Sequence, residues 1–131
     1  MKNDAKLGDP ALMEVDAGSQ KKDRPTEVFI FARFHAKEGG ERALGEAIRE
    51  EIQQARGDYG CLAIDAYASS GDTRLFFIHS RWVKKAAFEA HAATPHTLHF
   101  IELAETLIDH PLDVNRTQVL GGETYRSTSP L

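Results

Sequence analysis

The sequence predicts an α+β fold in which one ferredoxin-like antiparallel sheet carries its helices on one face. Two observations lead to this prediction. Strand-like and helix-like segments follow one another in the order strand, helix, strand, strand, helix, helix, strand. The polar turn 70–72, Ser-Gly-Asp, joins the two middle strands as a hairpin. A β-α-β-β-α-β order of this kind folds into a single antiparallel sheet, to which the second helical piece adds more cover.

The first four elements are predicted from their periodicity. Residues 28–36 form an apolar and aromatic run, as in a strand. Residues 41–55 carry apolar side chains at helical spacing, and this helix is expected to end at Gly57. The side chains of residues 61–68 alternate between two faces, as in a half-buried strand. Residues 74–83 are rich in aromatic and branched side chains, as in a strand. These two strands form the hairpin.

The last three elements follow from helical spacing and from a capping signal. Residues 84–92 place apolar side chains and a histidine on one face of a helix. Thr94 is expected to cap a further helix with Pro95 at its first position, and this helix should run until Pro111. Residues 113–120 supply the last strand. The inward-facing residues of the last helix are expected to be Leu98, Ile101, Leu107 and Ile108.

Both faces of the first strand carry large apolar side chains. Val28, Ile30, Ala32 and Phe34 lie on one side, whereas Phe29 and Phe31 share the other side with Arg33 and His35. The helices cover only one face, and no segment remains for the other. We therefore expect a homodimer in which two copies pack sheet against sheet.

Composition limits the class of protein. The 131 residues suffice for one domain, placed at 27–120 between a polar N-terminal arm, 1–26, which is flexible or docked on the surface, and a C-terminal tail, 121–131. With 16 basic and 20 acidic side chains the formal charge is −4, so no nucleic-acid partner is expected. No run is apolar enough for a membrane span or a signal peptide, which predicts a cytoplasmic protein without a membrane partner. The single cysteine, Cys61, is expected to be a buried structural residue.

Several motifs together resemble the antibiotic biosynthesis monooxygenase (ABM) family, which includes proteins described as quinol monooxygenases. The resemblance covers about residues 27–120, and its implications are a dimeric α+β barrel and oxidation of an aromatic substrate by molecular oxygen without a cofactor. The segments that carry it are 32–39, Gly60-Cys61-Leu62, Phe77-Ile-His-Ser-Arg-Trp82 with Ala86, Ala87 and Phe88, and His91-Ala-Ala-Thr-Pro-His96.

A cavity between sheet and helices is the expected site. Trp82 ends a strand and His91 faces back toward it, so His91 is the candidate catalytic base and Trp82 the residue that shapes the pocket. A buried neutral histidine accepts a phenolic proton, and the resulting anion reacts with oxygen more readily than the phenol does. A small quinol or polyphenol is therefore the expected substrate, with no metal. The substrate-binding residues are expected to be Ala32, Phe34, Ile78, Ser80, His96, Leu98 and Ile101.

Other interpretations stay open. Trp82 and His91 are also compatible with purely structural roles, and His91, His96 and His99 have no established zinc-site spacing. A further branch of the family shares the Thr-Pro-His stretch and isomerises a small hydroxyketone-type signal molecule. A non-catalytic barrel that binds a small ligand is the third alternative. Ser80 stands where the family usually has an acidic residue, and His96, Tyr67 and His79 are the alternative bases.

Overall fold

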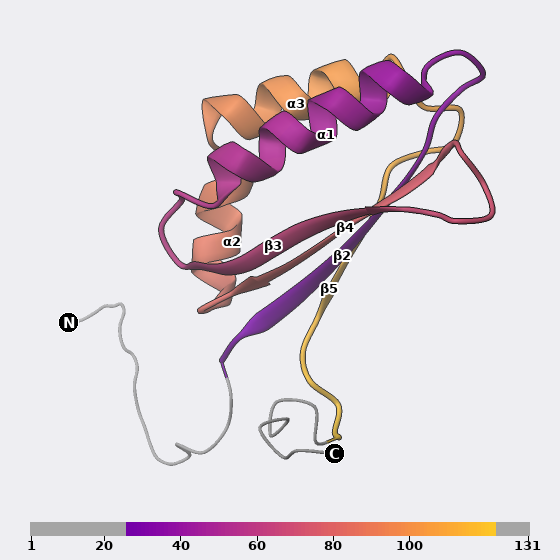
Figure 1. Ribbon diagram of the computed structural model, residues 1–131. Helices are drawn as coiled ribbons and strands as arrows, with labels where there is room; N and C mark the ends of the chain where they lie inside the picture. The colour runs from indigo at the N-terminus through magenta and orange to yellow at the C-terminus, as the bar shows by residue number, and fades with distance from the viewer. Residues whose placement is uncertain (1–25, 123–131) are drawn as a thin grey trace, which may run out of the picture.

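The computed structural model describes residues 26–122, and these form a four-stranded antiparallel sheet with three helices on one face (Figure 1). The sheet order β3-β4-β2-β5 is that of a ferredoxin-like fold, so the predicted fold class is confirmed. The predicted arm and nearly all of the predicted tail lie outside the described residues. The elements are β2 (Val28–His35), α1 (Glu41–Ala55), β3 (Cys61–Ala68), β4 (Leu75–Trp82), α2 (Lys85–Ala92), α3 (Pro95–Glu105) and β5 (Asp113–Thr117).

Strand β2 lies in the middle of the sheet and separates its two faces. It pairs along its whole length with β4, from Val28 opposite Trp82 to His35 opposite Leu75, and on its other edge with β5. Its even-numbered side chains are buried beneath the helices, whereas Phe31 is 49% exposed on the opposite face. The open face of the sheet is therefore lined by aromatic side chains in the single chain.

Helix α1 covers the sheet because its apolar residues repeat at helical spacing. Leu44, Ile48 and Ala55 are buried against the sheet and α3, and Phe34 meets Phe100 of α3 edge to face with ring centroids 5.7 Å apart. Figure 1 shows α1 and α3 side by side above the sheet, with α2 at one end. In the described part of the chain, no helix combines the length and apolarity needed to cross a bilayer.

Helix α3 differs from its prediction at two points. It ends at Glu105 instead of near Pro111, because the chain turns back and Ile108 forms a bridge with Ala36 beside the end of β2. Leu98 does not face inward and is 56% exposed. The buried side of α3 is formed by Thr97, Phe100 and Ala104, whose spacing of three and four residues defines the helix face. Strand β5 likewise ends at Thr117 instead of residue 120.

The end of the sheet near His35 is closed by a cluster of ion pairs. His35 Nδ1 lies 2.7 Å from Asp109 Oδ1, and His35 Nε2 lies 3.0 Å from Asp72 Oδ2. Hydrogen bonds to Asp109 and then Asp72 raise the pKa of His35, and hydrogen bonds from His35 and His110 lower the pKa of Asp109 to about 2. The cluster thereby joins β2 to the β3–β4 turn and to the chain before β5.

Gly60 allows the α1–β3 turn to approach the start of α2. Its φ is +81°, a left-handed conformation that favours glycine. A Cβ atom at this position would collide with Ala87 Cβ and lie 2.8 Å from Val83 Cγ1. The Gly60 carbonyl also accepts a 2.9 Å hydrogen bond from the Val83 N–H. This close approach places Asp58, two residues earlier, beside α2.

We expect Gly60→Ala to lower the free energy of unfolding by about 2–4 kcal/mol, because left-handed strain and overpacking act together. Gly39→Ala is the matched control: Gly39 has a φ of +85° but no atom within 4 Å of an added Cβ, so only the strain of about 1–2 kcal/mol applies. Urea unfolding followed by circular dichroism measures both variants. Equal losses would show that the contact with Ala87 and Val83 does not matter.

Candidate active site

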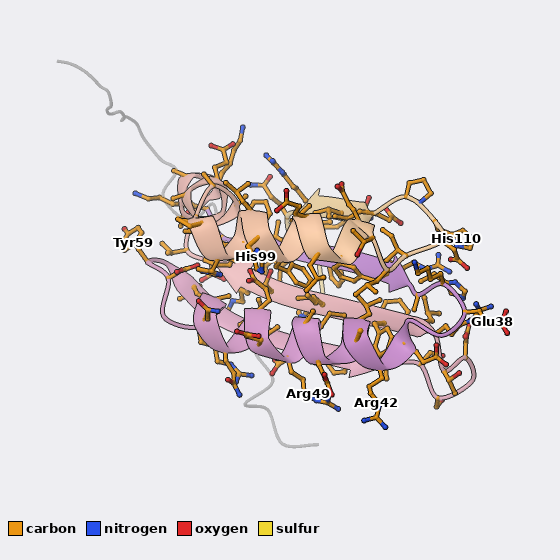
Figure 2. All side chains as sticks on the ribbon, turned by 90° about the horizontal axis from the view of Figure 1, so that it is seen from above. Glu38, Arg42, Arg49, Tyr59, His99 and His110 are labelled. Atoms are coloured by element: carbon orange, nitrogen blue, oxygen red, sulfur yellow. The ribbon has the colours of Figure 1, made fainter. Side chains whose placement is uncertain are left out.

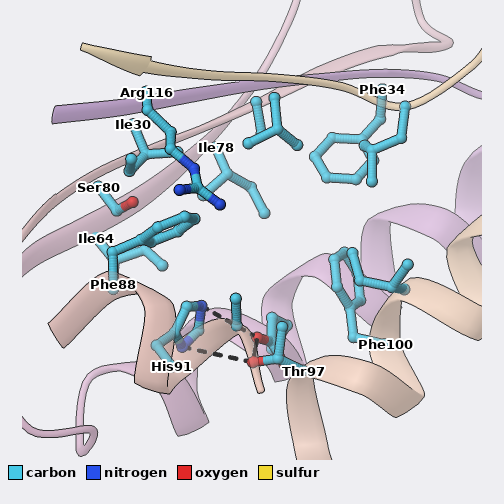
Figure 3. A pocket seen from close by; sticks show the side chains of 16 residues that line it. Ile30, Phe34, Ile64, Ile78, Ser80, Phe88, His91, Thr97, Phe100 and Arg116 are labelled. Carbon is cyan, nitrogen blue, oxygen red and sulfur yellow. Dashed lines mark hydrogen bonds and ion pairs between the residues drawn. The ribbon is translucent and has the colours of Figure 1, made fainter. Parts of the chain in front are cut away.

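A cavity of about 310 Å³ lies between the sheet and the helices (Figure 3). Its volume is near the lower end of the range for small-molecule sites, which suits a compact ligand. Its walls are mainly apolar, and five residues bring polar groups to it: Glu51, Ser80, His91, Thr97 and Arg116. The apolar lining is made by Ile30, Ala32, Phe34, Ile64, Ile78, Phe88, Ala92, Phe100, Ile101, Leu112 and Val114.

The residues expected to bind substrate divide into two groups. The structure places Ala32, Phe34, Ile78, Ser80 and Ile101 around the cavity with His91. Leu98, Trp82 and His96 do not line it. Leu98 points outward from α3, Trp82 lies behind His91, and His96 lies behind the cavity wall in contact with Glu51 and Asp58.

His91 presents one ring nitrogen to the cavity side because its other nitrogen is engaged. Its Nδ1 lies 2.8 Å from Asp58 Oδ2, and a carboxylate only accepts, so Nδ1 donates this hydrogen bond. This fixes the tautomer in which Nε2 carries a free lone pair. Nε2 lies 3.8 Å from Glu51 Oε2, beyond hydrogen-bond distance. His91 is thus oriented as a carboxylate-supported base.

Trp82 fixes the plane of the His91 ring. Its side chain is fully buried and stacks on His91, with ring centroids 4.6 Å apart and an angle of 30° between the planes. Its Nε1 donates a 2.9 Å hydrogen bond to Ser80 Oγ, which satisfies the polar atom of the buried indole. Ser80 thereby holds the tryptophan in place. Trp82 therefore acts on the site through His91.

His96 is held between two carboxylates. Its Nδ1 lies 2.9 Å from Glu51 Oε1, and its Nε2 lies 2.9 Å from Asp58 Oδ2. Both nitrogens must donate to satisfy both acceptors, so the ring is cationic. Burial alone would lower the pKa of His96, but the hydrogen bonds to Glu51 and Asp58 outweigh it and raise the pKa above 6.5. His96 thereby compensates negative charge next to the cavity.

Glu51 brings a carboxylate into the core. It is only 4% exposed, and besides His96 it accepts a 2.7 Å hydrogen bond from the Thr97 hydroxyl. Thr97 sits in the first turn of α3, where the predicted N-cap is confirmed: Thr94 Oγ1 accepts a hydrogen bond from the Thr97 N–H. The cap thus places two Glu51 partners, Thr97 and His96, at the start of one helix.

Sequence reasoning missed Glu51, Asp58, Thr97, Phe88 and Arg116. One of them had a detectable signal, since Glu51 continues the apolar stripe of α1, three residues after Ile48 and four before Ala55. Asp58 lies in a turn between two glycines, where aspartate is common for local reasons. Arg116 lies on an edge strand, where a charged residue normally faces solvent.

Within residues 26–122, two groups of side chains have the spacing of metal ligands. Ligand atoms of Glu51, His91 and His96 lie within 4.8 Å of one another, as do those of His35, Asp109 and His110. His99, which the sequence spaces near His91 and His96, is exposed on α3 and belongs to neither group (Figure 2). In the first group both nitrogens of His96 and Nδ1 of His91 already pair with carboxylates, so we interpret it as a hydrogen-bonded network.

Comparison with known proteins decides the family. Residues 27–103 match the family model described as antibiotic biosynthesis monooxygenase. The chain belongs to the ABM family. YcnE of Bacillus subtilis (strain 168), provisionally named a monooxygenase, is 30% identical over 79 residues, which cover 60% of this chain and 82% of YcnE.

Solved structures support the same fold for this ABM protein. PA3566 from Pseudomonas aeruginosa has a TM-score of 0.68 and 28% identity, covering 73% of this chain and 96% of that one. Rv0793 from Mycobacterium tuberculosis has a TM-score of 0.69 and 24% identity, covering 73% and 97%. The shared part is the sheet with its helices, which builds the cavity.

We expect the His96 cation to appear in the pH dependence of folding. Its folded-state pKa is raised, so its contribution to the free energy of unfolding is complete below pH 6.5 and is lost as the pH rises through the raised pKa. The stability difference between wild type and His96→Gln should therefore shrink as the pH rises above 6.5. His99→Gln, an exposed change on the same helix, is the control. Urea unfolding measures this difference in stability. If the difference stayed constant with pH, His96 would not be a cation in the folded protein.

Proposed function

We propose that this ABM protein is a monooxygenase that oxidises a quinol or a related polyphenol with molecular oxygen, using His91 as the base. The observation that carries the proposal is the free Nε2 of His91 beside an apolar cavity, with Nδ1 held by Asp58. Membership of the ABM family and the monooxygenase name of YcnE support the reaction class. No cofactor is invoked, because an electron-rich aromatic anion supplies its own electrons.

The first step is removal of a phenolic proton. A substrate hydroxyl near His91 Nε2 transfers its proton to the ring, and the imidazolium formed stays paired with Asp58 through Nδ1. The Glu51 carboxylate, 3.8 Å from Nε2, stabilises this positive charge. The apolar walls exclude water and so favour reaction of the anion with oxygen over reprotonation.

The overall reaction balances without an external reductant. The quinol anion gives one electron to oxygen, and the resulting radical pair combines at a ring carbon to form a peroxide. Loss of water from the peroxide leaves a hydroxylated quinone. One quinol and one O₂ thus give one hydroxyquinone and one water, and the substrate supplies all four electrons. One oxygen atom enters the product and the other enters water.

The walls of the cavity favour this reaction over isomerisation of a small hydroxyketone. A polyhydroxylated aliphatic ligand needs several hydrogen-bonding groups. The wall formed by β2, β3 and β4 is instead apolar, with Ser80 as its polar member, and consists otherwise of Ile30, Ala32, Phe34, Ile64 and Ile78. The Ser80 hydroxyl is already the acceptor of the Trp82 N–H. A flat aromatic ligand fits such a lining better.

We expect chelator-treated protein to consume oxygen with an electron-rich hydroquinone, and His91→Gln to slow this by about a hundredfold or more. An oxygen electrode measures the rate, and labelled O₂ shows whether one atom enters the product. His99→Gln is the control, and circular dichroism must show that both variants fold. Uptake no faster than autoxidation across a panel of quinols would refute the monooxygenase. An unchanged rate in His91→Gln would refute His91 as the base. The alternative bases His96, Tyr67 and His79 are absent from the cavity lining.

We also propose that two copies pack through the open sheet face, as in the dimeric barrel that the family resemblance implies. Phe31, Tyr67 and Phe77 are exposed on this face, and Phe31 stacks on His79 with ring centroids 4.7 Å apart. Clustered exposed aromatic side chains of this kind are typical of a protein interface.

We expect Phe31→Asp to shift the protein from dimer to monomer at micromolar concentration, because it places a carboxylate in an apolar interface. Analytical ultracentrifugation measures the mass. Leu98→Asp is the matched control, since Leu98 is similarly exposed but lies on α3 in the helix layer. A monomeric wild type, or equal effects of the two changes, would count against this interface.

A further inference from the structure

We propose that the cavity selects aromatic ligands that carry a carboxylate beside the reacting hydroxyl, and that Arg116 is the residue that binds this carboxylate. The inference deepens the proposed function and rests on it for the aromatic ring and for His91. It adds the substrate class, hydroxyaryl carboxylates, and a specificity residue on the edge strand.

Arg116 is the one arginine or lysine among the described residues that line the cavity. It projects from β5, where it pairs with Ile30 of β2. Figure 3 shows its side chain running from the sheet toward Phe88, while His91 belongs to the helix side of the cavity. Both side chains adjoin Phe88: Arg116 Cζ lies 5.3 Å and the His91 ring centroid 5.9 Å from the Phe88 ring centroid. A ligand therefore meets the guanidinium and the base at the same end of the cavity.

Two contacts hold the guanidinium at the cavity without neutralising it fully. Its Cζ atom lies 5.3 Å from the centroid of the Phe88 ring, a cation–π contact. Its Nη1 atom lies 3.4 Å from Glu89 Oε2, and both of these side chains are about half exposed. An exposed ion pair of this length contributes little. The stacked ring leaves the edge of the guanidinium available to a ligand.

Glu89 acts as a replaceable partner of Arg116. It also lies 3.9 Å from Lys85 Nζ, one helical turn away, so it keeps a cation when a ligand takes Arg116. A ligand carboxylate binds the planar guanidinium through two parallel hydrogen bonds, whereas Glu89 approaches through one. In a cavity with mainly apolar walls, a bound ligand carboxylate would be less hydrated than Glu89. Its ion pair with Arg116 would therefore be stronger than that of Glu89.

The test compares two stable ligands that differ by one carboxylate, 1-hydroxy-2-naphthoate and 1-naphthol, by isothermal titration calorimetry on the full chain. We expect wild type to bind the naphthoate about tenfold or more tightly than the naphthol. Arg116→Gln should weaken naphthoate binding much more than naphthol binding and so remove this preference. Arg116→Lys should keep part of it, because the charge remains and the two-pronged geometry is lost.

Glu89→Gln supplies the second arm, with the opposite sign. Removing the competing carboxylate should tighten naphthoate binding about two- to fivefold and leave naphthol unchanged. Arg81→Gln is the matched control, because Arg81 is paired with Glu27 and is absent from the cavity lining. It should change neither affinity.

Three results would overturn the proposal: equal affinities of wild type for the two ligands, loss of both ligands together in Arg116→Gln, or weaker naphthoate binding in Glu89→Gln.

Failure of this proposal is separable from failure of the proposed function. Oxygen uptake with a neutral quinol, 1,4-dihydroxynaphthalene, tests the reaction without any carboxylate. Uptake without carboxylate preference refutes only the ligand class, and preference without uptake refutes only the reaction.

Discussion

One oxygen atom, Oδ2 of Asp58, accepts hydrogen bonds from two histidines, and the chemistry of the cavity depends on this sharing. It fixes the tautomer of His91 and one of the two protons on His96. The three residues come from the α1–β3 turn, α2 and α3, so the contact also holds these elements together. A carboxylate that is largely withdrawn from water, as Asp58 is, needs such partners. Replacing Asp58 would therefore release the base and unbalance the charges near Glu51 in one step.

Most of the fold was predictable because its signals are local. The alternation in β2, the apolar stripe of α1 and the Thr94-Pro95 start of α3 each depend on residues close in sequence, and the structure confirms all three. The side of α3 that Leu98 occupies was not predictable in this way. The buried face of α3 is determined by Phe100, because Phe100 packs on Phe34 of β2, a strand distant in sequence.

The candidate site was predictable on the wall formed by β2 and β4, and on the helices at His91 and Ile101. The positions of Ala32 and Ile78 were predictable, because successive side chains of a strand point to opposite faces of the sheet. The charged partners behind His91 depend on contacts between segments distant in sequence. Asp58 is 33 residues from His91, and Glu51 is 45 residues from His96. Nothing in a single sequence distinguishes Glu51 from its exposed neighbours Glu46 and Glu50 except its place on the apolar stripe.

Alternate side chains of β2 line the cavity and the open face of the sheet. Ile30 and Ala32 face the cavity, and Phe29 and Phe31, which alternate with them along β2, face away. A shift of β2 by one residue against β4 would exchange the two sets and destroy both surfaces together. The cavity lining and the open aromatic face therefore both require the same register of β2 against β4.

Trp82 has a consequence beyond packing. It is the only tryptophan of the chain, it is shielded from water, and its indole lies face to face with the imidazole of His91. Indole emission is quenched more strongly by a protonated imidazole than by a neutral one. The protein thus contains its own optical reporter, in which the brightness of a single fluorophore follows the charge on the neighbouring ring. The protonation state of His91 can be followed in this way without attaching any label.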